Sequence, residues 1–211
     1  MAALAEDLTL LLLSADDTRD LGYQHGDPTR NAVGLAFLVE PWVDGGPPPT
    51  ADTIRRELPR TSSAACERAL DPLVGAGRVE QQRASSRLGR VFQKGQAKRW
   101  RVVDRAGRQA VFERVAASLG GTTPPSRPDA TLAVLLWASG TWDRSGLDGP
   151  LPMPYVSVGA DPQPWGPLGA GARALASGTA VPAGETDPGV LPLLARALSL
   201  GDLVTRLDDA P

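Results

Sequence analysis

Short runs of leucine and alanine, separated by breaks rich in proline and glycine, supply most of the apolar surface of this 211-residue chain. Leucine and alanine are strong helix formers, whereas the aromatic residues that favour strands account for only 5% of the sequence. The dense run near the start, Leu8–Leu13, is far shorter than the roughly 20 apolar residues that cross a membrane. A chain of this length can bury a real core. The pattern therefore predicts a mainly α-helical single domain.

Helical periodicity and capping residues place the expected helices. Asp27 followed by Pro28, Thr50, and Asp129 are suited to helix starts. The most apolar segment, residues 130–138, is expected to be buried on most sides. The predicted helices cover residues 3–14, 28–40, 51–58, 62–74, 105–118, 130–138 and 191–207.

Residues 147–188 differ in composition from the residues before them. Seven of these 42 residues are glycine and eight are proline, a composition that disfavours a long helix or a central strand. We therefore expect a helical domain over residues 1–146, a Gly/Pro-rich irregular segment over 147–188, and a C-terminal helix within 189–211 that packs on the domain.

The stretch from Arg78 to Arg108 carries most of the positive charge. It holds ten basic residues and two acidic ones, a net charge of +8 in a chain whose formal total is −2. Short runs at 78–82 and 89–93 flank a polar turn at 83–87, which predicts a projecting basic β-hairpin. A concentrated positive field attracts phosphates, whether of a membrane surface or of a nucleic acid.

Residues for catalysis or metal binding are few. The single histidine, His25, is expected to be a surface residue, and the single cysteine, Cys66, a small apolar residue of a helix. One cysteine forms no internal disulfide and suits a reducing cytoplasm. The acidic turn of Asp16, Asp17, Asp20 and Asp27 matches no calcium loop. The sequence thus predicts a cytoplasmic protein with no signal peptide, metal, cofactor or catalytic residue.

One interpretation of the basic stretch is a winged-helix DNA-binding fold. Helices over 51–58 and 62–74, joined by a turn and followed by a basic hairpin, have the order of such a domain. The exposed side of the second helix, however, offers Glu67 and Asp71 as well as Arg68, and Pro72 interrupts it.

A second interpretation comes from a resemblance to the Golgi phosphoprotein 3 family. The opening Leu4-Ala-Glu-Asp-Leu-Thr-Leu-Leu-Leu-Leu13 is similar to the start of bacterial members of that family. The similarity returns in several later blocks and extends over residues 3–145. These blocks are 69–80, 88–92, 99–104, 115–121 and 128–136.

The resemblance implies a helical domain with a hairpin, whose eukaryotic relatives bind phosphatidylinositol 4-phosphate and retain glycosyltransferases. Arg30 falls at the first lipid-contacting arginine of the family, and Arg68 aligns with a neighbouring arginine. Two further family arginines fall near Ser63 and Cys66. The hairpin tip is apolar in the family and basic in this chain.

These observations lead to the hypothesis of a peripheral membrane adaptor that binds anionic phospholipid headgroups and a protein client. A DNA-binding protein, and an enzyme or scaffold of a bacterial pathway on a repurposed family fold, are the alternatives. The candidate lipid-binding residues are Arg30, Arg68, Arg83, Arg87, Arg90, Lys94, Lys98 and Arg99.

Overall fold

The computed structural model describes residues 4–13, 27–82, 99–121, 123–139, 166–186 and 189–199. Of these described residues, 72% are helical, and the two strands among them form one antiparallel hairpin. This confirms the prediction of a mainly α fold with a hairpin. The elements are α1 (Leu4–Leu12), α2 (Asp27–Val43), α3 (Ala51–Gly75), β1 (Val79–Gln82), β2 (Arg99–Val102), α5 (Arg105–Gly120), α6 (Arg127–Ala138), α7 (Gly166–Ala176) and α8 (Val190–Ser199).

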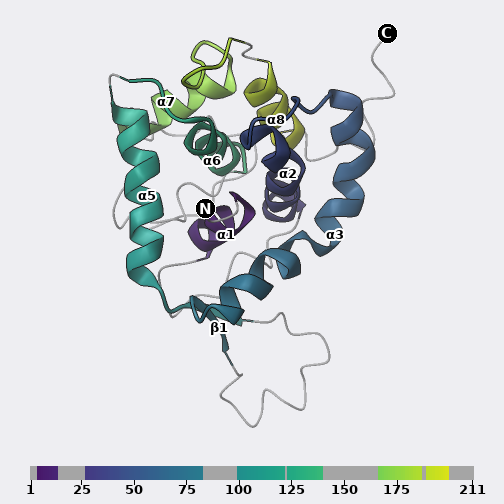
Figure 1. The fold of residues 1–211 in the computed structure, drawn as a ribbon, viewed down its shortest axis with the longest axis vertical. Helices are drawn as coiled ribbons and strands as arrows, with labels where there is room; N and C mark the ends of the chain where they lie inside the picture. Colours follow the sequence, from purple (N-terminus) through teal and green to yellow (C-terminus); the bar gives the residue numbers. More distant parts are fainter. Residues whose placement is uncertain are drawn as a thin grey trace.

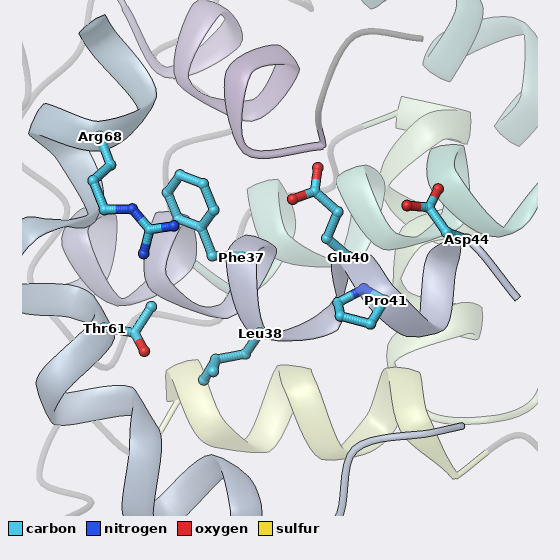
Figure 2. Close-up of a pocket in the computed structure, with 7 residues that line it drawn as sticks. All are labelled: Phe37, Leu38, Glu40, Pro41, Asp44, Thr61 and Arg68. Atoms are coloured by element: carbon cyan, nitrogen blue, oxygen red, sulfur yellow. The ribbon is translucent and has the colours of Figure 1, made fainter. Parts of the chain in front are cut away.

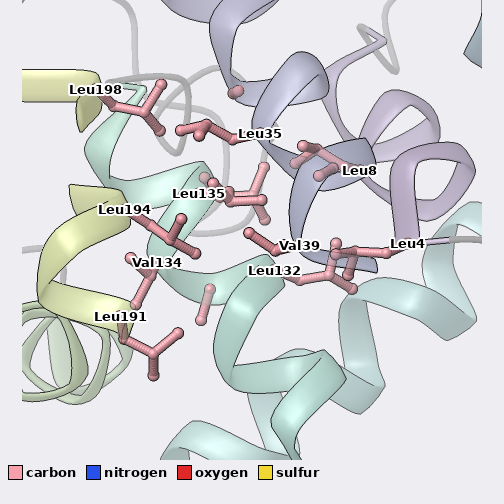
Figure 3. Close-up of a cluster of buried hydrophobic side chains, with 14 of the residues drawn as sticks. Leu4, Leu8, Leu35, Val39, Leu132, Val134, Leu135, Leu191, Leu194 and Leu198 are labelled. Atoms are coloured by element: carbon pink, nitrogen blue, oxygen red, sulfur yellow. The ribbon is translucent and has the colours of Figure 1, made fainter. Parts of the chain in front are cut away.

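Helix α6 lies in the middle of the molecule (Figure 1). Every side chain from Asp129 to Leu136 is buried, so no face of this part of the helix meets solvent. Helices α1, α2, α5, α7 and α8 all pack against it. Figure 3 shows its Leu132, Val134 and Leu135 among side chains of α1, α2 and α8. The expectation that this helix is buried on most sides is confirmed.

The first turn of α6 differs from the prediction at its cap. Ser126, and not Asp129, is the N-cap residue, and its hydroxyl accepts a hydrogen bond from the Asp129 amide. The Asp129 carboxylate is instead buried, where it accepts a hydrogen bond from the Ser126 hydroxyl and contacts Arg114. Thr50, by contrast, caps α3 as predicted by accepting from the Thr53 amide at 3.1 Å.

Helix α3 corrects a second prediction. The two helices expected over 51–58 and 62–74 are one continuous helix of 25 residues, with Pro59 and Pro72 inside it. Proline removes one backbone hydrogen bond and bends a helix without necessarily ending it. Figure 1 shows α3 changing direction along its length. Ser62, the first residue of the predicted helix 62–74, lies inside α3 and is buried against α2.

A glycine allows α2 and α3 to approach closely. A Cβ atom built at Gly34 would lie 2.5 Å from the Ser62 hydroxyl oxygen and 3.1 Å from the Ser62 Cα. The Ser62 hydroxyl is buried and forms no hydrogen bond. The two helices are therefore in contact through their backbones at this point, with no room for a side chain.

We predict that Gly34→Ala destabilises the protein by about 2 kcal/mol, because the new methyl group must push the helices apart. Urea unfolding followed by circular dichroism measures this. Gly75→Ala is the matched control, since nothing lies within 4 Å of its added Cβ, and it should be neutral or stabilising. Adding Ser62→Ala to Gly34→Ala should restore part of the loss. An unchanged midpoint in Gly34→Ala would contradict the close contact.

The hairpin has a different second strand from the one predicted. β1 pairs antiparallel with β2, with Val79 opposite Val102 and Gln82 opposite Arg99. The predicted strand at 89–93 lies outside the described residues. The observed register buries both valines in a second apolar cluster, with Leu10, Leu13, Leu70 and Leu73. That burial favours Arg99–Val102 as the partner of β1.

The Gly/Pro-rich segment contains a helix, so the irregular structure predicted for 147–188 is wrong for residues 166–176. Gly171 allows α7 to pack closely on α5, because an added Cβ atom would lie only 3.2 Å from the Leu119 carbonyl oxygen. Ala172 and Leu175 join the main core, as do Leu191, Leu194 and Leu198 of α8. The segment after α7 is also tied to α6 by an ion pair of 2.8 Å between Arg127 and Glu185.

A three-residue ion network joins α1, α5 and α6. Arg114 contacts Asp7 at 2.9 Å and Asp129 at 2.7 Å, and the Ser126 hydroxyl donates to Asp129 at 2.6 Å. The side chains of Asp7 and Asp129 are only 6% and 10% exposed. Two buried carboxylates therefore depend on a single arginine for compensation.

Arg114→Gln should destabilise the protein by about 3 kcal/mol, since it leaves two buried carboxylates without a cation. Arg56→Gln is the control, because its ion pair with Glu57 is exposed and such pairs contribute about 1 kcal/mol or less. Thermal and urea unfolding of both variants test the difference. Equal effects would show that the network does not hold the three helices together.

Candidate functional site

The residues predicted to bind lipid fall into three groups. Arg30 near the start of α2 and Arg68 in α3 are described and exposed. Arg99 begins β2, and its side chain is not among those described. The other five lie outside the described residues: Arg83, Arg87, Arg90, Lys94 and Lys98.

The basic side chains that the structure describes in the hairpin strands and their flanks are engaged within the protein. Arg78 pairs with Asp104 at 2.9 Å, and Arg101 pairs with Glu80 at 2.6 Å across the two strands. Arg108 is buried in α5 and donates to the Leu11 carbonyl. Its burial lowers its pKa from the ordinary value, so this arginine serves the core and not a surface.

The net positive charge of the hairpin therefore belongs to residues 83–99. These residues contain six basic side chains and no acidic one. They connect Gln82 of β1 to β2. In the sequence, this basic segment follows β1 and runs into β2, and the two strands are anchored to the core through Val79 and Val102.

Asp104 holds the second strand to the start of α5. Its carboxylate accepts from the Gly107 amide at 2.8 Å and from the Arg78 guanidinium at 2.9 Å. The hydrogen bond from Gly107 and then the one from Arg78 lower the pKa of Asp104 below its ordinary value of 3.8. The charged form is therefore the one that stabilises this end of the hairpin.

Because the folded pKa is lowered, the contribution of Asp104 is complete at neutral pH and is lost as pH falls below 3.8. We predict that Asp104→Ala costs about 1 kcal/mol at pH 7 through the lost cap. The difference from the native protein should shrink between pH 4 and pH 2. Urea unfolding across that range measures it.

Asp104→Asn serves as the comparison, since an amide oxygen can still cap Gly107 but does not titrate. Its unfolding free energy should differ less from the native value at pH 7 than that of the alanine variant. A pH-independent difference between native protein and Asp104→Ala would rule out the charge as the cause.

The structure brings Arg68 against α2 but, among the residues it describes, shows no contact between Arg30 and α3. Gly34 and Phe37 lie on the face of α2 that meets α3, and Arg30 precedes them at helical spacing. The Arg68 guanidinium stacks on the Phe37 ring at 4.4 Å from its centroid, a cation–π contact. Seven residues of helix, about 10 Å, separate Arg30 from Phe37.

The two positions where the family has arginines add no charge. Ser63 is exposed, and its hydroxyl donates to the Arg60 carbonyl at 2.8 Å. Cys66 is half-buried and packs against the main core, which agrees with its prediction as an apolar residue.

A shallow cavity of about 400 Å³, largely open to solvent, lies beside the Arg68–Phe37 stack. Figure 2 shows its lining, with Arg68 next to Phe37 and two carboxylates on the following turns of α2. The lining consists of Phe37, Leu38, Glu40, Pro41, Asp44, Thr61 and Arg68. The sequence did not reveal this cavity. The helical spacing of Arg30 and Phe37 follows from the sequence of α2. The contact between Phe37 and Arg68 depends on how α3 packs against α2.

Two exposed valines flank the base of the hairpin. Val74 is 40% exposed and Val103 is 48% exposed, and these are the large exposed apolar side chains in the part of the chain that the structure describes. The Val103 amide donates to the Arg78 carbonyl at 2.8 Å. Val74 precedes Arg78 by four residues in the sequence. One exposed valine therefore lies on each side of the hairpin in the sequence, close to where its strands are anchored.

Other kinds of site receive no support from the described residues. Among them, no three His, Cys, Asp or Glu side chains are placed to hold a metal ion. None of the described helices is long and apolar enough to span a membrane. His25 and the acidic turn at 16–20 lie outside the described residues.

Comparisons with known proteins add no relative. No family model matches the chain, and neither a curated protein nor a solved structure matches it significantly.

Proposed function

We propose that this protein is a peripheral membrane protein that binds anionic phospholipid headgroups, on a fold related to the Golgi phosphoprotein 3 family. The observation that carries the proposal is the uncompensated charge of residues 83–99, six basic side chains without an acid. The strands on either side have their own charges paired, through Arg78–Asp104 and Arg101–Glu80. The six basic side chains of 83–99 are the ones that we propose contact an external anion.

The expected affinity follows from the number of engaged side chains. Each Lys or Arg near an anionic leaflet contributes on the order of 1 kcal/mol at low salt. Five or six such contacts give useful but reversible binding, which weakens as salt screens the charges.

A membrane fits the surface better than a nucleic acid does. The continuous helix α3 removes the helix–turn–helix on which the DNA-binding alternative relied. Exposed Val74 and Val103 beside the hairpin suit the apolar–polar boundary of a bilayer and offer nothing to a phosphate backbone. The role of an adaptor for a protein client comes from the family resemblance alone.

The test is vesicle flotation with neutral and anionic vesicles at two salt concentrations. Replacing Arg83, Arg87, Arg90 and Lys94 with glutamine should weaken binding to anionic vesicles at low salt by ~4 kcal/mol, or several hundredfold. The matched control replaces Arg55, Arg56, Arg60 and Arg173, which are exposed elsewhere, and changes the net charge equally. It should lose less than tenfold.

Equal losses in the two variants would show that only net charge matters, and the absence of salt-sensitive binding to anionic vesicles would refute the proposal. A duplex-DNA shift assay run in parallel covers the alternative. Sequence-selective binding of DNA below micromolar concentration would replace the lipid proposal with the nucleic-acid one.

A further inference from the structure

The cavity between α2 and α3 contains opposite charges that do not pair with each other. Arg68 stacks on Phe37, and no acidic side chain pairs with it within the described part of the chain. Glu40 is held differently, because one carboxylate oxygen accepts from the Leu4 amide at 3.0 Å. Each charge is thus fixed by its own neighbour, and hydrogen-bonding capacity remains on both sides of the cavity.

The acidic side of the cavity has a negative potential from two sources. Glu40 lies in the last turn of α2 and Asp44 directly follows the helix, which has no basic residue in that turn. The C-terminal end of a helix carries a partial negative charge, so carboxylates there are unfavourable until a cation approaches. This side of the cavity is therefore suited to an ammonium group.

The basic side is suited to a phosphate or a carboxylate. The Arg68 guanidinium keeps its planar set of donors because stacking engages only its face. The Thr61 hydroxyl lines the same cavity, and Leu38 and Pro41 make part of its wall apolar. One helical turn, about 5 Å, separates Phe37 from Glu40 along α2. Glu40 therefore lies one turn along α2 from the ring on which Arg68 stacks, and both charged side chains line the same cavity.

We infer that this cavity binds a zwitterionic phosphodiester with a primary ammonium group, with the phosphate on Arg68 and the ammonium between Glu40 and Asp44. A cavity of about 400 Å³ is large enough for such a group. The two carboxylates oppose a polyanionic headgroup, so the cavity differs in its preference from the basic segment at 83–99. The inference rests on the proposed function in one respect: a membrane is the nearest source of this chemistry, as an ethanolamine headgroup.

Two soluble probes of the same size test the site directly. Glycerophosphoethanolamine carries the ammonium group, and glycerophosphoglycerol has the same phosphodiester without it. Titrations followed by ³¹P nuclear magnetic resonance should show at least fivefold tighter binding of the ethanolamine probe to the native protein. Equal binding of the two probes, or binding of neither, overturns the inference.

Three variants separate the roles of the side chains. Arg68→Gln should weaken both probes at least fivefold, whereas Arg60→Gln, exposed on the same helix, should not. Glu40→Gln combined with Asp44→Asn should abolish the preference, with the glycerol probe bound at least as tightly as before because two repelling charges are removed. Glutamine at position 40 can still accept from the Leu4 amide, which preserves the fold. Asp52→Asn combined with Glu57→Gln is the control with the same change in charge, and it should keep the preference.

Vesicles distinguish a lipid source from a free phosphodiester. At high salt, which screens the basic segment, flotation should favour vesicles with phosphatidylethanolamine over vesicles of phosphatidylcholine, whose ammonium group donates no hydrogen bond. If the soluble probes discriminate and the vesicles do not, the ligand is the free phosphodiester. Failure of low-salt binding to anionic vesicles would refute the proposed function and leave the soluble-probe result unchanged.

Discussion

The burial of α6 on all sides is the constraint on which this fold depends. A helix with no solvent-facing side from Asp129 to Leu136 must be surrounded, and α1, α2, α5, α7 and α8 each cover part of it. Each covering helix then needs only one apolar face, which suits the short leucine and alanine runs of the chain. The buried Asp129 is compatible with this arrangement only because Arg114 and the Ser126 hydroxyl contact its carboxylate.

Pairing of charges shapes the surface as much as the core. At least six arginines in the described part of the chain contact a carboxylate, as Arg78 contacts Asp104 and Arg127 contacts Glu185. Two other sets of basic side chains carry our proposals: those of 83–99, which have no acid among them, and Arg68, which stacks on Phe37. The first suits a broad anionic surface and the second a small anion, because a long-range field and a fixed guanidinium select ligands differently.

The cavity that contains Arg68 exists because of how α2 and α3 meet. Gly34 brings the backbones into contact at Ser62, and the helices then leave room further along for a stacked arginine and two carboxylates. The kink-prone Pro59 lies just before this contact in α3. A site of mixed charge thus follows from one small residue and one continuous helix.

The helical class, the positions of most helices, the Thr50 cap and the excess of positive charge near the hairpin could be predicted from the amino-acid sequence, because they follow from local periodicity and composition. Packing between distant segments set the other features. It joined 51–58 and 62–74 into one helix, paired Val79 with Val102, and made a helix of 166–176. It also buried Arg108 and placed Arg68, Glu40 and Asp44 in the lining of one cavity. Each of these depends on the free energy gained by burying side chains that are distant in sequence, which local propensity does not contain.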